Sequence, residues 1–300
     1  MAHASLKIGV RGNRLGMSIG KQTAEELRPH LGEVTIEFVP IADPGRRTTS
    51  PWPGGALERA LAQQEVQMVI QNAKDASPAT SGITIAAVTA RFTPFDVLIA
   101  PDDAILDELP EGAALSAHTA LRRAQLLNYR NDFRIVDFAG SLEERIRMLE
   151  HGDVDGLVVS ASAVEHLGLQ DRVTEIFTTA VLLPAPGQGS AVIQVRSSDK
   201  DLVKAAKHLN DAESRAEFDA ERGFLKALGA DARAPVGALA QNDGTSIRLE
   251  GVVAERDGAR LFRDVEAGDP KEAAEIGERL ARRLLAEGGR HALAAAESER

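Results

Sequence analysis

The chain has 300 residues, of which 43% are hydrophobic, and a formal net charge of −10. This length allows two or three domains, each with its own core. No block of like charges occurs, so we expect neither a nucleic-acid surface nor an anionic-membrane surface. No run of 18 apolar residues and no basic-then-apolar leader is present, so we expect a cytoplasmic protein.

The chain contains no cysteine. This excludes disulfides, thiolate metal sites, thiol nucleophiles and cysteine-tethered cofactors. The seven histidines have no HxxxH or HxH spacing that would place two imidazoles together. We therefore predict no metal site.

Apolar runs alternate with helical patterns through the first two thirds of the chain, in the βαβ rhythm that predicts a mostly parallel sheet. A first unit has expected strands at residues 6–10, 34–41 and 66–71 and expected helices at residues 20–31 and 55–64. A second unit has expected strands at residues 95–100, 133–138 and 154–161 and expected helices at residues 119–129 and 141–152. The sequence therefore predicts two similar α/β units in succession.

The apolar run SAVIQVR at residues 190–196 follows the second unit. We expect this strand to return to the first sheet, which gives two lobes of the periplasmic-binding-protein type with crossing linkers and a ligand cleft between them. The expected domains are a first α/β lobe of residues 1–92 and 189–208, a second α/β lobe of residues 93–188, and a small α+β domain of residues 209–300.

The third domain is expected to contain a helix at residues 213–228, two alternating strands, and a last helix with a clear start and stop. Asp269 is the expected N-cap, with Pro270 at the first helical position. Gly288 and Gly289 are the expected stop.

Charged residues follow directly on the apolar run that ends the first unit. The segment VQMVIQNAKDASP at residues 66–78 places Asn72, Lys74 and Asp75 at the mouth of a strand. These residues are either a solvated strand end or a carboxylate aimed into the cleft. The segment by itself favours neither interpretation.

Arginines occur where two expected helices begin. Arg122 and Arg123 lie at the start of a helix, where they oppose the positive end of its dipole unless a carboxylate or phosphate binds there. Arg11 follows a strand and enters a glycine-containing turn, where backbone amides could bind an anion. A solvated helix face is the alternative interpretation for the arginine pair.

Two proline-rich segments are candidate cleft walls. LLPAPGQGSAVIQVR, at residues 182–196, reads either as a tight linker between the lobes or as a wall of the site, and one segment can be both. Trp52, the only tryptophan, is either a lid aromatic or a packing anchor.

These motifs, in this order and spacing, resemble the hydroxymethylbilane synthase family, also called porphobilinogen deaminase. The resemblance covers almost the whole chain. The matching segments are IGVRGNRLG, NAKDASP, LRRAQL, ERIRMLEHGDVDGLVVSASAVEHLGL, LPAPGQGSAVIQVR, LNDAESRAEFDAERGFLKAL and APVGALA.

The family joins porphobilinogen units on a dipyrromethane cofactor held by a cysteine, and an aspartate stabilises the azafulvenium cation that forms when ammonia leaves. The resemblance places that aspartate at Asp75, with Lys74 as its catalytic neighbour. It implies that the substrate is held by Arg11, Asn13, Asn72, His118, Thr119, Arg122, Arg123, Arg145, His166 and Gln188, with Trp52 as a candidate stacking lid.

The sequence also departs from the family pattern. The position of the cofactor-bearing cysteine is Ala232, so no thioether can form and we expect no bound cofactor. The family's flexible lid is replaced by the shorter PGRRTTSPWPGG at residues 44–55. Other family side chains are replaced at Asn13, Gln71, Asn72, His118, Ala120, Ala139 and His166.

These departures argue against ordinary tetrapyrrole assembly. We expect a monomeric enzyme that deaminates porphobilinogen or a related aminomethylpyrrole and couples it to an acceptor held without a covalent bond. The alternative is a non-catalytic protein that binds a pyrrole or another small carboxylate in the same cleft.

Overall fold

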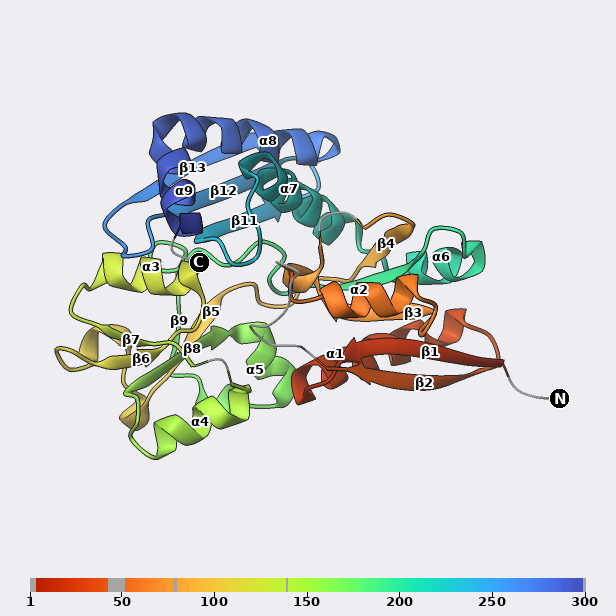
Figure 1. Cartoon of the computed structure of the whole chain (residues 1–300), viewed down its shortest axis with the longest axis horizontal. Coiled ribbons are helices and arrows are strands. Elements are labelled where there is room, and N and C mark those ends of the chain that lie inside the picture. The colour runs from red at the N-terminus through yellow and green to blue at the C-terminus, as the bar shows by residue number, and fades with distance from the viewer. Residues whose placement is uncertain (1–3, 43–51, 78–79, 139, 299–300) are drawn as a thin grey trace.

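The computed structural model describes residues 4–42, 52–77, 80–138 and 140–298. Figure 1 shows two α/β lobes side by side and a third domain, which contains α7, α8 and α9, above them. The α/β class, with two five-stranded sheets and a small third sheet, confirms the fold expected from the sequence.

The first lobe is built on the sheet β2-β1-β3-β10-β4. Its strands are β1 (Ala4–Arg11), β2 (Val34–Ile41), β3 (Met68–Asn72), β4 (Ile83–Val88) and β10 (Ala191–Arg196). Its helices are α1 (Arg14–Leu27), α2 (Gly55–Ala62) and α6 (Lys200–Ala206). β1 is parallel to β2 and β3, whereas β10 is antiparallel to β3 and β4.

The second lobe repeats this arrangement in the sheet β7-β6-β8-β5-β9. Its strands are β5 (Asp96–Ile99), β6 (Ala114–Ser116), β7 (Arg134–Val136), β8 (Gly156–Ser160) and β9 (Glu175–Ile176). Its helices are α3 (Ala120–Tyr129), α4 (Leu142–Glu150) and α5 (Ala161–Leu167). β5 is the antiparallel strand here, in the place that β10 takes in the first lobe.

Two chain segments cross between the lobes, because β4 leads into β5 and β9 leads into β10. The crossings run together: Thr89 N donates to Ala191 O at 3.0 Å and Phe92 N donates to Gly189 O at 2.9 Å. The strand expected to return to the first sheet is β10, which lies between β3 and β4. The crossings therefore join two lobes that have separate cores, and we call the two crossings the hinge.

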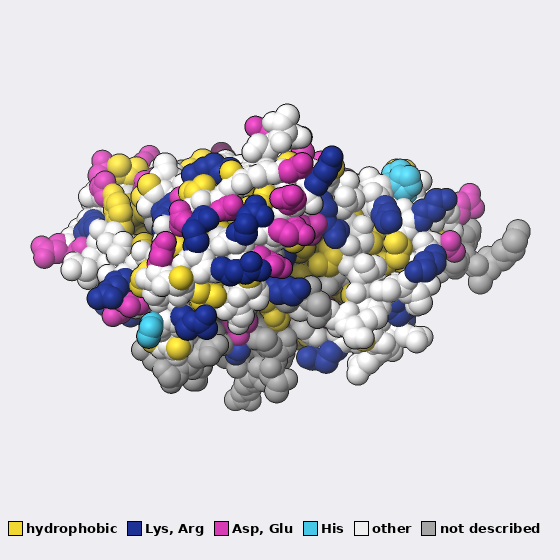
Figure 2. Space-filling view, turned by 90° about the horizontal axis from the view of Figure 1, so that it is seen from above, with side chains coloured by type: hydrophobic (Ala, Val, Ile, Leu, Met, Phe, Trp, Pro, Cys, Tyr) yellow, Lys and Arg dark blue, Asp and Glu magenta, His cyan; other side chains and the backbone are white. Residues whose placement is uncertain are grey.

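The third domain packs α7 (Ala212–Leu228) and α8 (Ala273–Leu284) against an antiparallel sheet. Its strands, in the order β11-β12-β13, are Val236–Asn242, Ile247–Ala254 and Leu261–Gly268. Phe224, Ile276 and Leu280 are fully buried in its core. Basic and acidic side chains are intermixed on the face of the molecule that carries this domain (Figure 2).

The structure contains strands β4, β6, β9 and β11 and helices α5 and α6, which the sequence analysis did not predict. Three expected helix boundaries also differ. α1 begins six residues earlier than expected, at Arg14, because Asn13 Oδ1 accepts a hydrogen bond from Gly16 N at 2.7 Å and caps the helix. Asp269 caps a 3₁₀ turn, Pro270–Glu272, that precedes α8. Gly288 does not end the helical region, since a π-helical turn (Leu285–Gly289) leads into α9 (Arg290–Ser298).

Within the described ranges, no helix combines the length and apolarity that crossing a bilayer requires.

Candidate functional site

The strand mouth after β3 is a single 3₁₀ turn, Ala73–Asp75. Asn72 caps this turn, because its Oδ1 accepts from Lys74 N at 3.2 Å. Ala73 N donates to Ser190 O in the second crossing at 2.8 Å. The turn is therefore attached to the hinge by its backbone.

Two glycines hold the same turn from other sides. Gly54 N, just before α2, donates to Asp75 O at 2.9 Å. Gly187 has a φ of +81°, and a Cβ there would lie 3.0 Å from both Ala73 C and Lys74 N. Only glycine allows this backbone conformation and this close approach without strain. The PGQG segment therefore lies in the second crossing and packs closely against the turn that carries Asp75.

Asp75 pairs with Arg11 across the first sheet. Arg11 Nη1 lies 2.9 Å from Asp75 Oδ2, and the two side chains keep 27% and 15% of their surface exposed. The pair forms because β1 and β3 are adjacent parallel strands whose carboxyl ends meet at one edge. The carboxylate is held in place but remains accessible to a ligand.

Lys74 reaches the second crossing, where its Nζ lies 3.5 Å from Gln188 Oε1. Burial lowers the pKa of Lys74, and the positive charge of Arg122 lowers it further, against the opposing effect of Asp75. A lysine whose pKa is lowered releases a proton more readily than an ordinary one, so it is a candidate for proton transfer.

Arg122 is buried and paired within the second lobe. Its Nε and Nη2 donate to Asp96 Oδ2 and Oδ1 at 2.9 and 2.8 Å, and Gln188 Nε2 donates to the same carboxylate at 2.7 Å. Thr119 Oγ1 accepts from Arg122 N at 3.2 Å and caps α3. The resemblance implied that Arg122 holds a substrate carboxylate. In the structure its guanidinium is already paired with Asp96, so the geometry does not support that role.

Arg145 is also buried, but its hydrogen bonds go to neutral oxygens. It donates to Ser116 Oγ at 3.1 Å, to Ser116 O at 2.8 Å and to Val158 O at 2.9 Å. Burial lowers its pKa to about 9, and the charge of Arg122 contributes. An anionic ligand would therefore relieve an unfavourable positive charge here. Arg123, by contrast, is exposed on α3.

His118 lies among these cations. Burial and the charges of Arg145, Arg122, Lys74 and Arg11 lower its pKa. Part of the residue's surface is nonetheless exposed to solvent. The structure thus brings Arg11, Lys74, Arg122 and Arg145 together around His118, and we call these four residues the basic cluster.

Trp52 packs into the core of the third domain and not toward the basic cluster. It is 7% exposed and belongs to the core of the third domain, and the Arg222 guanidinium lies 4.9 Å from the centre of its ring. The ring is covered by Arg222, so the packing-anchor interpretation of Trp52 fits the geometry better than the stacking lid. Residues 44–51 of the expected lid lie outside the described residues.

Arg222 of α7 was not expected in the site. Its Nη2 donates to the carbonyl of Ala73, so the third domain holds the turn that carries Asp75. Burial lowers its pKa to about 10, and its Nε and Nη1 are buried without a hydrogen-bond partner among the described residues. The sequence did contain a sign of this role: Arg222 is a charged residue on the apolar face of the helix, between Phe218 and Leu225.

A second buried pair fixes the hinge to the third domain. Arg91 Nη1 donates to Glu221 Oε1 at 2.8 Å, and Arg91 Nε donates to Gln188 O at 2.8 Å. Glu221 is fully buried and also accepts from Gly187 N at 2.5 Å and from Ala240 N at 2.9 Å. The third domain therefore supports the inter-lobe hinge.

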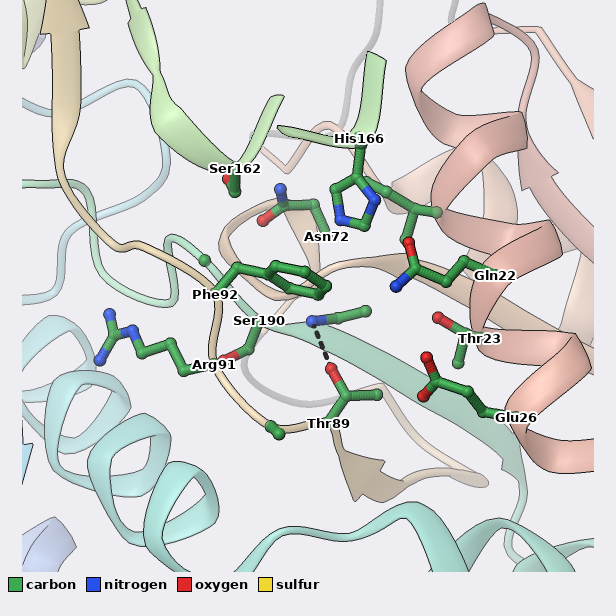
Figure 3. Close-up of a pocket in the computed structure, with 14 residues that line it drawn as sticks. Gln22, Thr23, Glu26, Asn72, Thr89, Arg91, Phe92, Ser162, His166 and Ser190 are labelled. Carbon is green, nitrogen blue, oxygen red and sulfur yellow. Dashed lines mark hydrogen bonds between the residues drawn. The ribbon is translucent and has the colours of Figure 1, made fainter. Parts of the chain in front are cut away.

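A cavity of about 200 Å³ lies between the lobes, beside the turn. Its walls are α1, α5 and the two crossings, and Asn72 lines it (Figure 3). His166 projects into it and packs on Phe92, with ring centres 4.8 Å apart. Burial lowers the pKa of His166. Ala139, another position of this lobe where the family side chain is replaced, lies outside the described residues.

Ala232, the position that the family resemblance assigns to the cofactor-bearing cysteine, is exposed in the turn after α7. Its neighbours Asp231 and Arg233 pair with each other at 3.0 Å. A methyl side chain has no nucleophile, and the chain has no cysteine elsewhere. A thioether-linked dipyrromethane therefore does not fit these residues.

The family models and the sequence relatives agree on one family. A family model described as porphobilinogen deaminase, dipyromethane cofactor binding domain, matches residues 6–204, and one described as porphobilinogen deaminase, C-terminal domain, matches residues 216–286. Porphobilinogen deaminase of Pelotomaculum thermopropionicum is 39% identical over 272 residues, which cover 90% of this chain and 85% of that protein. Porphobilinogen deaminase of Thermus thermophilus is 34% identical over 294 residues, which cover 96% of this chain and 97% of that protein.

Among solved structures, the methionine binding protein MetQ is similar with a TM-score of 0.44 at 15% identity, covering 68% of this chain and 89% of that chain. The family models and the sequence relatives span both lobes and the third domain. The chain belongs to the porphobilinogen deaminase family.

Proposed function

We propose that this protein deaminates porphobilinogen or a closely related aminomethylpyrrole and transfers the resulting methylene carbon to an acceptor that is not covalently bound to the protein. The observation that carries the proposal is the Asp75 carboxylate, held 2.9 Å from Arg11 at the mouth of β3 and still partly exposed. Family membership supports the substrate class.

In this deamination the main contribution of the protein is electrostatic stabilisation of a cation. The C–N bond of the aminomethyl group breaks, its electron pair leaves with ammonia, and an azafulvenium cation remains. A carboxylate that is already oriented stabilises such a cation without reorganisation. Asp75 supplies this group, and Lys74, whose pKa is lowered by burial, is placed next to it for proton transfer.

The basic cluster supports binding of a substrate with carboxylate arms. Arg145 adds a buried positive charge whose hydrogen bonds go to neutral oxygens, which favours an anion nearby. Arg11 is partly exposed and can contact a ligand while it holds Asp75. Arg122 contributes positive charge, although its guanidinium is paired with Asp96.

The test is ammonia release by the purified protein incubated with porphobilinogen, with mass spectrometry of the products. Release of ammonia with a coupled product supports the proposal. The intact mass of the protein should equal its sequence mass, because Ala232 cannot form an adduct. A mass increase of two pyrrole units would contradict the cofactor-free reaction.

A non-catalytic pyrrole-binding protein is the second candidate, and the alanine at position 232 favours it, since the family's anchor for the growing product is missing. Saturable binding of porphobilinogen without ammonia release would establish this candidate and exclude the first.

A further inference from the structure

The cavity beside the turn is lined mostly by neutral and acidic side chains, whereas the basic cluster consists of lysine and arginines. Its walls include Ile19, Thr23 and Glu26 of α1 and Ser162 and His166 of α5. It shares Asn72 with the catalytic turn, since the side chain of Asn72 caps that turn and also lines the cavity. A molecule bound in this cavity would therefore lie next to the turn that carries Asp75.

Two polar side chains at this cavity have no hydrogen-bond partner among the described residues. Ser162 is 2% exposed and its Oγ is unsatisfied, and His166 Nδ1 is buried and also unsatisfied. Buried polar atoms are nearly always paired in folded proteins, so two such atoms at one cavity indicate a missing ligand or water. Both can accept a hydrogen bond from a ligand donor.

The charge at the cavity is neutral to negative. Arg91 is the one Lys or Arg among its described lining residues, and its guanidinium is paired with Glu221 at 2.8 Å and Glu217 at 3.3 Å. Figure 3 shows Arg91 directed away from His166, whereas Glu26 lies on the same side of the cavity as Gln22 and Thr23. A carboxylate bound here would lose water without gaining a cation.

We propose that this cavity is the acceptor subsite and that the acceptor is a small primary amine rather than a carboxylate-bearing pyrrole. This inference rests on the proposed deamination. The carboxylate arms of the donor lie on the basic cluster, and the amine donates hydrogen bonds to Ser162 and His166. The cavity of about 200 Å³ has room for a small amine.

The coupling step balances without an oxidant or reductant. The donor reacts in its ammonium form: its C–N bond breaks, and neutral ammonia leaves with the electron pair. The lone pair of the acceptor amine then forms a new C–N bond to the methylene carbon, and the amine nitrogen loses one proton. One amine replaces another, and the ammonia released carries the proton away as ammonium.

The binding test uses the full-length protein with ¹⁵N-labelled histidine and ethanolamine as the probe, with acetate as the anionic counterpart. We expect a saturable shift of the His166 ring signals with ethanolamine and none with acetate. Ser162→Ala and Glu26→Gln should each weaken ethanolamine binding at least several-fold. Glu33→Gln, at an exposed glutamate beyond the C-terminal end of α1, is the matched control and should bind as the wild type does. Equal response to acetate, or no response to ethanolamine, overturns the inference.

The second arm measures products from porphobilinogen with and without ethanolamine. We expect an ethanolamine-substituted pyrrole whose yield falls at least several-fold in Ser162→Ala. Ammonia release without this product, even at saturating ethanolamine, overturns the inference and leaves the proposed deamination standing. A His166 shift with ethanolamine but no ammonia release supports the ligand class of the cavity and contradicts the proposed function.

Discussion

Each lobe has an arginine–aspartate pair near the hinge, but the two pairs differ in their surroundings. In the first lobe, Arg11 and Asp75 share a single contact of 2.9 Å and remain 27% and 15% exposed. In the second lobe, Arg122 and Asp96 form two hydrogen bonds and are 5% and 2% exposed. The same two residue types therefore have different environments, because solvent reaches one pair and is nearly excluded from the other.

The buried pair shows what a closed ion pair requires. Gln188 donates to Asp96 from the second crossing, so the acid is fully satisfied and links α3 to the hinge. In the open pair, Asp75 retains surface that a cation could contact. We infer that the first pair is the reactive one and that the second holds the architecture together.

The largest expected effect is on stability, from Asp96→Asn. The substitution leaves Arg122 buried without a compensating charge, which lowers the free energy of unfolding by about 3–5 kcal/mol. Denaturant unfolding measures this. Glu150→Gln, which breaks the exposed pair with Arg172, is the control and should cost less than about 1 kcal/mol. Similar losses in both variants would mean that Arg122–Asp96 is not a structural pair.

Asp75→Asn should have the opposite profile, with a small effect on stability and a large one on turnover. Loss of one preorganised electrostatic partner lowers kcat by about 10²–10³. Ammonia release from porphobilinogen measures kcat, and binding of porphobilinogen should change by only a few-fold. Asp171→Asn, at an exposed acid of the second lobe, is the control. Equal loss of binding and turnover would show that Asp75 only supports the fold.

Arg222→Met tests whether the third domain positions the reactive pair. Because Arg222 is a buried cation with two unsatisfied nitrogens, we expect a stability change below about 1.5 kcal/mol. The lost bond to Ala73 should lower kcat by roughly tenfold, about 1.4 kcal/mol, with KM changed less. Arg222→Lys should recover part of kcat, and Lys226→Met on the exposed face of α7 should retain it. An unchanged kcat in Arg222→Met would exclude a positioning role.

The smallest expected effect concerns acid stability and His118. Its folded-state pKa lies below the ordinary 6.5. As the pH falls below 6.5, the unfolded chain takes up this proton first, so stability decreases with falling pH. His118→Gln should therefore make the pH dependence of unfolding shallower between pH 6.5 and 4, by less than one proton because the residue is exposed. An unchanged dependence would show that the basic cluster does not act on His118.

Much of the reactive pair could be predicted from local patterns. The apolar run ending in Asn72, Lys74 and Asp75 identified a strand mouth, and Arg11 followed the neighbouring strand. Adjacent parallel strands end at the same edge, so their terminal residues meet. The partner of Arg122 could not be found in this way, because Asp96 lies in the antiparallel strand that enters from the crossing.

The third-domain contributions were also beyond local reasoning. Trp52 read as a lid or an anchor, and its burial against Arg222 depends on how the third domain packs on the first lobe. The cavity at His166 likewise forms between α1 and α5, which belong to different lobes. Contacts between different domains do not produce a periodic pattern of apolar residues in the sequence of either segment.

The sequence by itself determined the α/β class, the return of β10 to the first sheet, the strand-mouth aspartate and the absence of any thiol, because periodicity and residue chemistry are local properties. Only the tertiary structure decided which arginine is exposed and which is neutralised, where Trp52 is buried, and that a cavity with unsatisfied polar atoms lies beside the turn. Exposure and charge compensation depend on which surfaces the lobes and the third domain bring together, and that is a property of packing in three dimensions.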